Sequence, residues 1–232
     1  MGHQHGTFGW LLVSLLGLCL VAPTFEIAGD PGGAAVGMML IGVFYAWVLW
    51  STIRAIGGKQ RDRLIVVVLS VGAIAPRFGV IFMSGEWLWL VAYSFDLIVL
   101  GFVTWHLVTG LFRPGRVTAG LIAASLCAYL MIGLFFSSVY GLLDTLNPGS
   151  FLVNGEPGLT QLHRTEGTAL YFSLVTLTTL GYGDVLPQNS LARMLAAVQA
   201  VIGQVYLTVL VARLVGLHIA ASTPGGQATG TE

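Results

Sequence analysis

Charged side chains are scarce in this chain. Asp, Glu, Lys and Arg make up 9% of its 232 residues, whereas about 25% is typical of soluble domains. Ten basic and ten acidic residues cancel, so no net charge attracts nucleic acid, and we expect no nucleic-acid partner. Hydrophobic residues account for 56% of the chain, and the mean hydropathy is +0.85. These values indicate a polytopic protein whose main partner is the lipid bilayer.

Cysteine is also rare, and the N-terminus lacks basic residues. Cys19 and Cys127 both lie inside apolar stretches, where a disulfide across a loop is not expected. Residues 1–9 contain no Lys or Arg, so the first apolar run lacks the basic start of a secretory signal peptide. We therefore count this run as a membrane span.

Long apolar runs dominate the sequence. A spanning helix needs about 20 mostly apolar residues, and six runs of that size occur at residues 8–26, 34–53, 64–84, 87–110, 117–143 and 191–217. A seventh run, residues 167–178, is too short to cross and is typical of a re-entrant segment. The expected fold is all-α and polytopic, with six transmembrane helices and a re-entrant helix between the fifth and the sixth.

Basic residues in short loops indicate the cytoplasmic side of a membrane. The loops after the second and fourth runs contain the basic residues Arg54, Lys59, Arg61, Arg63, Arg113 and Arg116. The loops after the first and third runs contain acidic residues and no basic one. We therefore expect both termini in the cytoplasm and residues 144–190 on the outer side of a cell membrane, of the bacterial plasma-membrane type.

Residues 178–184 read Thr-Thr-Leu-Gly-Tyr-Gly-Asp and follow the short apolar run. Potassium ions can leave water when rings of backbone carbonyls replace their hydration shell. Glycine adopts backbone conformations that other residues resist, so Gly181 and Gly183 suit a strand whose successive carbonyls face one axis. One such strand supplies a quarter of each ring, which predicts a homotetramer around one pore.

This motif, between a short apolar helix and a long one, resembles the pore-loop potassium channels over residues 117–217. The resemblance implies a selectivity filter made of Thr179, Leu180, Gly181, Tyr182 and Gly183. It implies K⁺ sites at the carbonyls of the first four of these residues and at the hydroxyl of Thr179. It also implies that Tyr182 braces the filter against the short helix, and that residues around the filter support it, namely Asp184, Tyr171, Val175 and Thr178.

Two positions depart from the family pattern. Leu180 stands where the filter usually has Val, and a side chain without a branch at Cβ is less rigid there. Val175 stands where some simple bacterial channels have a Glu that shares a hydrogen bond with the filter Asp. We therefore expect Asp184 to take another partner, and Tyr171 is the candidate.

The last apolar run contains the expected gate. Gly203 matches the gating hinge of the resembled family; the alternative is a close packing contact with the fifth helix. Residues that follow at spacings of three and four share one helical face, which we expect to line the inner cavity and the gate: Gln204, Leu207, Val211 and Val215.

Arginine and lysine are absent from the fourth run, where voltage sensors carry their charges. Steep voltage gating is therefore not expected. Arg77 and Asp96 lie in the third and fourth runs, and we expect them to pair, either as a structural bridge or as part of a sensor. The chain then divides into a four-helix voltage-sensor-like domain (1–116), a pore domain with outer helix, pore helix, filter and inner helix (117–220) and a polar, glycine-rich disordered tail (221–232).

The resulting hypothesis is a potassium channel subunit that conducts K⁺ passively and needs no cofactor other than the permeant ion. A weakly selective monovalent cation channel is one alternative. A potassium transporter is another, although such chains carry four pore-loop units. A membrane enzyme is the third, and the scattered Ser, His and Asp residues offer no combination of nucleophile, base and metal ligands for it.

Overall fold

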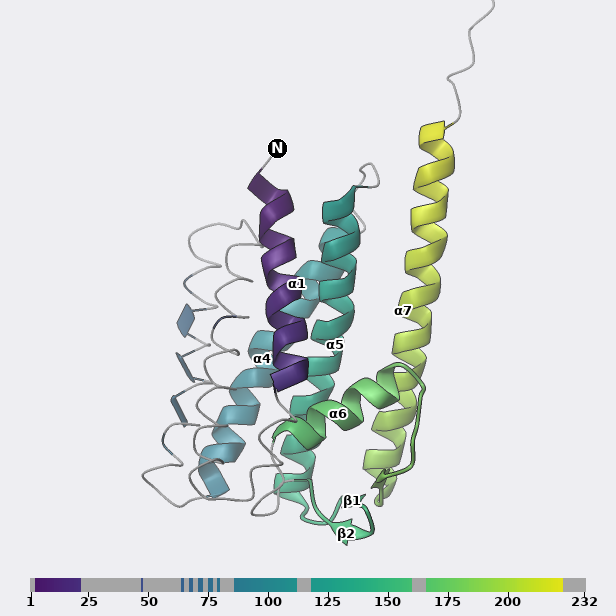
Figure 1. The fold of residues 1–232 in the computed structure, drawn as a ribbon. Helices are drawn as coiled ribbons and strands as arrows, with labels where there is room; N and C mark the ends of the chain where they lie inside the picture. The colour runs from purple at the N-terminus through teal and green to yellow at the C-terminus, as the bar shows by residue number, and fades with distance from the viewer. Residues whose placement is uncertain are drawn as a thin grey trace, which may run out of the picture.

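The structure, a computed structural model, describes residues 3–21, 86–111, 118–159 and 166–222, together with single positions between 47 and 79. The described chain is mainly helical (Figure 1). Its helices are α1 (His3–Val21), α4 (Glu86–Leu111), α5 (Ala119–Leu146), α6 (Glu166–Leu177) and α7 (Ser190–Ser222). Its strands are β1 (Phe151–Val153), β2 (Glu156–Pro157) and β3 (Val185–Pro187).

Three helices in this described part are long and apolar enough to cross a membrane: Trp87–Leu111, Ala119–Leu146 and Ser190–Leu217. They correspond to the fourth, fifth and sixth apolar runs of the sequence. The first run forms α1, whose apolar portion, Phe8–Leu20, is shorter. The expected spans at 34–53 and 64–84 lie almost entirely outside the described residues.

Helices α1 and α4 each pack against α5, and α7 runs along the other side of the molecule (Figure 1). Helix α6 lies across the bundle, beside α5 and the lower part of α7. Helix α1 begins and α7 ends on one side of the molecule, which we call the inner side, and the strands lie at the opposite, outer side. Helix α7 continues to Ser222, so residues 221 and 222 are helical rather than part of a tail; residues 223–232 lie outside the described chain.

One hydrophobic core joins α1, α4 and α5. Buried side chains from each helix meet in it, among them Leu15 of α1, Val103 of α4 and Met131 of α5. Leu170 of α6 also joins this core. One core therefore joins described helices on both sides of the domain boundary that the sequence analysis placed after residue 116, and α1 and α4 support α5 directly.

A second core holds α6 against α5 and β1. It is built on the rings of Tyr140, Phe151 and Phe172, whose centroids lie 5.0 to 5.5 Å apart with tilted or edge-on planes. Such aromatic contacts favour one relative orientation over others. The cluster therefore fixes the position of the short helix that precedes residues 178–184.

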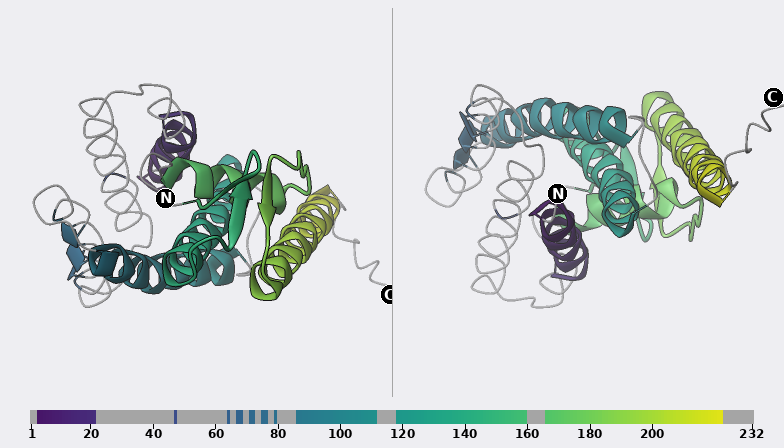
Figure 2. Two further views of the ribbon diagram at one scale, coloured as in Figure 1. Left: turned by 90° about the horizontal axis from the view of Figure 1, so that it is seen from below. Right: turned by 90° about the horizontal axis from the view of Figure 1, so that it is seen from above.

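The three strands form one antiparallel sheet in the order β2-β1-β3, which lies between α5 and α7 (Figure 2). Val153 of β1 pairs with Val185 of β3, directly after residues 178–184. Asn189 then links the sheet to α7, because its side-chain oxygen accepts a hydrogen bond from the Ala192 amide at 2.7 Å and its amide group donates to Ser150. The segment 178–184 is therefore held at both ends.

Candidate functional site

The candidate site begins where α6 ends. The amides of Thr178, Thr179 and Leu180 donate to carbonyls of the last helical turn at 2.9 to 3.0 Å. The carboxyl end of a helix carries partial negative charge, which favours a nearby cation. The site segment, residues 178–184, therefore leaves α6 from an end that is electrostatically suited to a positive ion.

The backbone of this segment alternates in handedness. The φ angle is positive at Thr179 (59°), Gly181 (58°) and Gly183 (84°), but not at Leu180 or Tyr182. In an ordinary strand, successive peptide groups point to opposite sides of the chain. Where neighbouring residues have opposite handedness, successive peptide groups point to the same side, as in the N–H concavities that bind anions. A row of carbonyl oxygens on one side of the chain is the arrangement that can replace the water shell of K⁺.

Thr179 departs from ordinary backbone geometry. Together with Asn154, it is one of two non-glycine residues with positive φ in the described part of the chain. Left-handed geometry is costly for a residue branched at Cβ, and such strain persists only where the surroundings impose it. The Thr179 hydroxyl donates to the carbonyl of Thr178 at 2.7 Å, which contributes to holding this conformation.

Side chains of the segment are open in the single chain. Leu180 is 55% exposed and Tyr182 is 68% exposed. The Tyr182 ring is therefore largely uncovered in one chain, and its bracing of the filter against the short helix stays a prediction. Residues 178–183 are all exposed, whereas Asp184 is partly buried.

Asp184 closes the outer end of the segment. The hydroxyl of Tyr171 on α6 donates to its carboxylate at 2.6 Å, which is the partner proposed from the sequence. Burial, followed by this hydrogen bond, raises the pKa of Tyr171 to about 12, so the phenol stays a donor at neutral pH. The Asp184 carboxylate also accepts from the Val185 amide, and its carbonyl accepts from the Asn154 amide at 2.8 Å. Support of a filter by this pair stays a prediction.

Three elements converge on the last carbonyl of α6. The Tyr129 hydroxyl of α5 donates to the Leu177 carbonyl oxygen at 3.1 Å. Gly203 of α7 lies against the same oxygen, which a Cβ atom at that position would overlap. The sequence analysis offered a close contact between Gly203 and the fifth helix; the structure gives that contact to α6 instead. The hinge role of Gly203 stays a prediction.

A buried hydrogen-bond network behind the segment was missed in the sequence. Gln199 is fully buried; its oxygen accepts from Tyr140 at 2.6 Å, and its nitrogen donates to the carbonyl and hydroxyl of Ser173 at 3.0 and 2.7 Å. The Ser173 hydroxyl donates to the Gly133 carbonyl at 2.6 Å. A carboxamide in the middle of an apolar span was the available signal, because uncompensated polar groups are costly there.

The remaining predicted residues fall in three places. Gln204 donates to the Thr179 hydroxyl oxygen at 3.2 Å, while Val211 and Val215 lie exposed further along α7 and Leu207 is half-buried. Val175 is buried in α6. Asp96 is buried in α4 and accepts from Ser138 of α5 at 3.4 Å; Arg77, its expected partner, lies outside the described residues.

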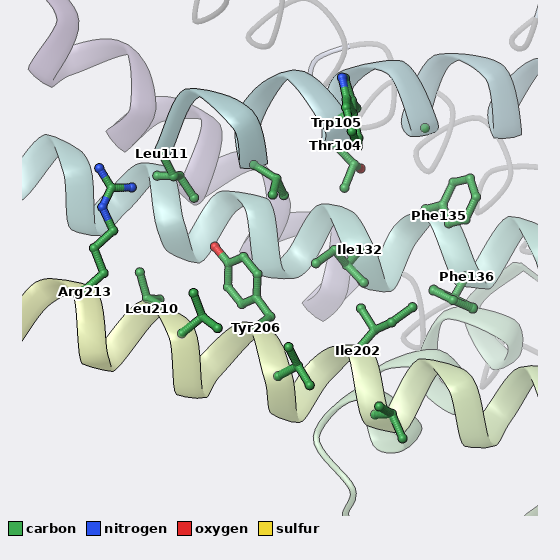
Figure 3. Close-up of a pocket in the computed structure, with 15 residues that line it drawn as sticks. Thr104, Trp105, Leu111, Ile132, Phe135, Phe136, Ile202, Tyr206, Leu210 and Arg213 are labelled. Atoms are coloured by element: carbon green, nitrogen blue, oxygen red, sulfur yellow. The ribbon is translucent and has the colours of Figure 1, made fainter. Parts of the chain in front are cut away.

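A cavity of about 610 Å³ lies beside the site, between α4, α5 and α7 (Figure 3). Its lining is almost entirely apolar, with Ile132, Phe136 and Ile202 toward one end and Arg213 at the other. An apolar wall offers no oxygens to replace the water of an ion. The cavity therefore offers no oxygen ligands for a dehydrated K⁺, whereas the carbonyls of the site segment do.

Comparison with known proteins agrees with this geometry. Residues 125–218 match the family described as "Ion channel". Two-pore potassium channel 1 of Arabidopsis thaliana is 45% identical over 53 residues, which are 22% of this chain and 15% of that protein. Two pore potassium channel a of Oryza sativa subsp. japonica is 29% identical over 106 residues, 45% of this chain and 26% of that protein.

The matched region therefore spans about a quarter or less of these relatives. No solved structure gives a match. The region that matches the family, residues 125–218, contains α6, the site segment and nearly all of α7. These are the elements that the geometry brings together. Residues 125–218 therefore form an ion channel region that is similar to the matched parts of potassium channels.

Proposed function

We propose that four copies of this chain form a channel that conducts K⁺ passively and selectively, with residues 179–183 as the filter. The alternating handedness at Thr179, Gly181 and Gly183 is the observation that carries this proposal, because it suits a row of carbonyls on one face. The carboxyl end of α6 and the carboxylate of Asp184 add negative potential at the two ends of the segment.

The fourfold assembly follows from the count of filter strands. A ring of carbonyls needs four strands, and one TLGYG sequence occurs in this chain. The exposed filter segment and the exposed apolar face of α7, with Val201, Val205 and Val209, are surfaces that neighbouring copies would cover. The names of the plant relatives refer to two pores, so the number of copies in the assembly must be measured. Cross-linking of the purified protein does this. Products of four linked chains support the proposal, and products of no more than two linked chains contradict it.

The proposed topology has six transmembrane spans, with α6 re-entrant and both termini cytoplasmic. The common side of the start of α1 and the end of α7 supports an even number of crossings. The inner side would then be cytoplasmic and the β1 to β2 turn external. A single cysteine at Asn154, in a chain whose Cys19 and Cys127 are replaced, tests this: labelling from the outside of intact cells supports the orientation, and labelling only after lysis reverses it.

Weak dependence on voltage is part of the proposal. Helix α4 contains no Arg or Lys, and each charge moved across the field contributes only about 2.3 kcal/mol per 100 mV. Without several such charges, opening cannot depend steeply on voltage. A conductance curve as steep as that of an arginine-bearing channel would contradict this point.

The decisive experiment is recording from purified protein in planar bilayers. Under mixed K⁺ and Na⁺ gradients, the reversal potential should lie near the K⁺ equilibrium value. Leu180 favours the alternative of a weakly selective monovalent cation channel, because its side chain is less rigid than Val. The variant Leu180→Val is the matched comparison: equal K⁺ and Na⁺ permeability in the original chain, with selectivity gained in the variant, would establish that alternative.

A further inference from the structure

Gln204 reaches from α7 to the inner end of the filter segment. Its side-chain nitrogen lies 3.2 Å from the hydroxyl oxygen of Thr179. Both residues are exposed in the single chain, so the contact lies at an open surface rather than inside a helix interface. The two polar groups therefore face the same space, next to the carboxyl end of α6.

The direction of the hydrogen bonds settles which end of the carboxamide faces Thr179. The Thr179 hydroxyl has one proton, and it donates that proton to the Thr178 carbonyl at 2.7 Å. Its oxygen must then accept from Gln204, so the NH₂ group of Gln204 faces Thr179 and the carbonyl oxygen, Oε1, points elsewhere. Within the described residues, the Gln204 side chain makes its hydrogen bond through the nitrogen, and Oε1 accepts none.

We propose that Oε1 of Gln204 is a ligand for a monovalent cation at the inner mouth of the filter, below the Thr179 hydroxyl. The proposal rests on the proposed function, since four copies are needed to place four such oxygens around one axis. An amide oxygen is chemically the same kind of ligand as a filter carbonyl. The site would hold a partly hydrated K⁺ as it enters or leaves the filter.

The surroundings of Gln204 favour a ligand over a buried structural contact. Leu207, Val211 and Val215, which follow it on the same helical face, are apolar, and the hydroxyl of Thr208 on that face donates to the backbone carbonyl of Gln204. A carboxamide in a membrane helix is costly unless it finds a partner, and such residues mark ion paths. Gln199, five residues earlier, is by contrast fully buried with both ends of its carboxamide bonded. The two glutamines therefore have different roles.

Recording from the full chain in planar bilayers tests the proposal. Ba²⁺, a divalent cation close to K⁺ in size, is added to the inner side as the probe, and its block is measured along with the unitary conductance at several K⁺ concentrations. The variant Gln204→Leu removes the oxygen, and Gln204→Glu keeps an oxygen and adds charge. The control Gly216→Gln places a carboxamide elsewhere on α7, where nothing lies within 4 Å of an added Cβ atom.

A ligand role predicts shifts of opposite sign. Gln204→Leu should weaken inner Ba²⁺ block about tenfold, and Gln204→Glu should strengthen it by about the same factor, since hydrogen-bond and ligand contacts to charge are of that order. Gly216→Gln should leave the block unchanged. If Gln204→Leu carries no current, the strengthened block of Gln204→Glu still supports the proposal.

Two results would overturn it, and they differ from failure of the proposed function. If both Gln204 variants weaken the block alike, Gln204 only braces Thr179. If both carry K⁺ current with unchanged block, Oε1 is not a ligand. Absence of K⁺ current from the unaltered chain would instead overturn the proposed function, and the ligand role would fall with it.

Discussion

Gly203 of α7 lies against the carbonyl oxygen of Leu177, the last residue of α6, so closely that a methyl group on Gly203 would overlap it. The same oxygen accepts a hydrogen bond from Tyr129 of α5. Three helices thus meet at one peptide group, two residues before Thr179. A displacement of α7 would therefore be transmitted directly to the inner end of the segment proposed as the filter.

Gly203→Ala should disturb this junction. The added methyl group meets backbone rather than a flexible side chain, so relief requires movement of α6 or α7, at a cost of about 1–3 kcal/mol. We expect a lower unfolding temperature in detergent and loss of selective K⁺ current. Gly216→Ala is the matched control on the same helix, because nothing lies within 4 Å of its added Cβ. Equal behaviour of the two variants would show that the contact at Leu177 is unimportant.

Tyr171→Phe should weaken the outer end of the filter segment. It removes the 2.6 Å hydrogen bond to Asp184 and leaves a partly buried carboxylate with one donor fewer. The stabilising free energy of this contact should fall by about 1–3 kcal/mol. We expect K⁺ current that decays faster during sustained recording, while the fold persists. Asp184→Asn keeps an oxygen acceptor and should have a smaller effect. Sustained currents identical to those of the original chain would argue against any supporting role for this pair.

Gln199→Leu should destabilise the fold rather than alter permeation. It leaves the Tyr140 hydroxyl and the Ser173 hydroxyl without their partner in a buried setting, and each unsatisfied group costs about 1–3 kcal/mol. Thermal unfolding in detergent measures the loss. Val198→Leu, at the exposed neighbouring position, should change stability by less than about 0.5 kcal/mol. Comparable stability of both variants would mean that the network contributes little.

The pairing of Arg77 with Asp96 remains a prediction that a double-mutant cycle can test. Asp96 is buried between α4 and α5, and removing one partner of a buried ion pair costs more than removing both. We expect Arg77→Gln and Asp96→Asn to show a coupling free energy above about 1 kcal/mol in unfolding measurements. Additive losses would indicate that the two charges have separate partners.

Much of the described architecture follows from periodicity and hydropathy. Long uncharged runs must be helical in a bilayer, because every backbone polar group needs a partner there. The runs at 87–110, 117–143 and 191–217 accordingly appear as α4, α5 and α7 with ends shifted by a few residues. The short run became α6, and its length alone excluded a crossing.

The contacts of single residues could not be foreseen in the same way. Gly203 was expected to act as a hinge or to pack on the fifth helix, and its neighbour is α6. Gln199 was not singled out at all, although it joins α5, α6 and α7. Which face of a helix meets which neighbour depends on how elements far apart in the chain pack, and local sequence does not specify that packing.

Hydropathy and motif alone were enough to indicate a membrane protein whose chemically specific segment is TTLGYGD. Glycines at alternate positions permit left-handed backbone, and sequence reveals glycine directly. Only the tertiary structure showed that Thr179, which is not glycine, shares that handedness. Tyr171 was proposed from the sequence as the partner of Asp184. The contact between Gln204 and the Thr179 hydroxyl came from the structure, because the packing of α7 against the segment brings together residues 25 positions apart.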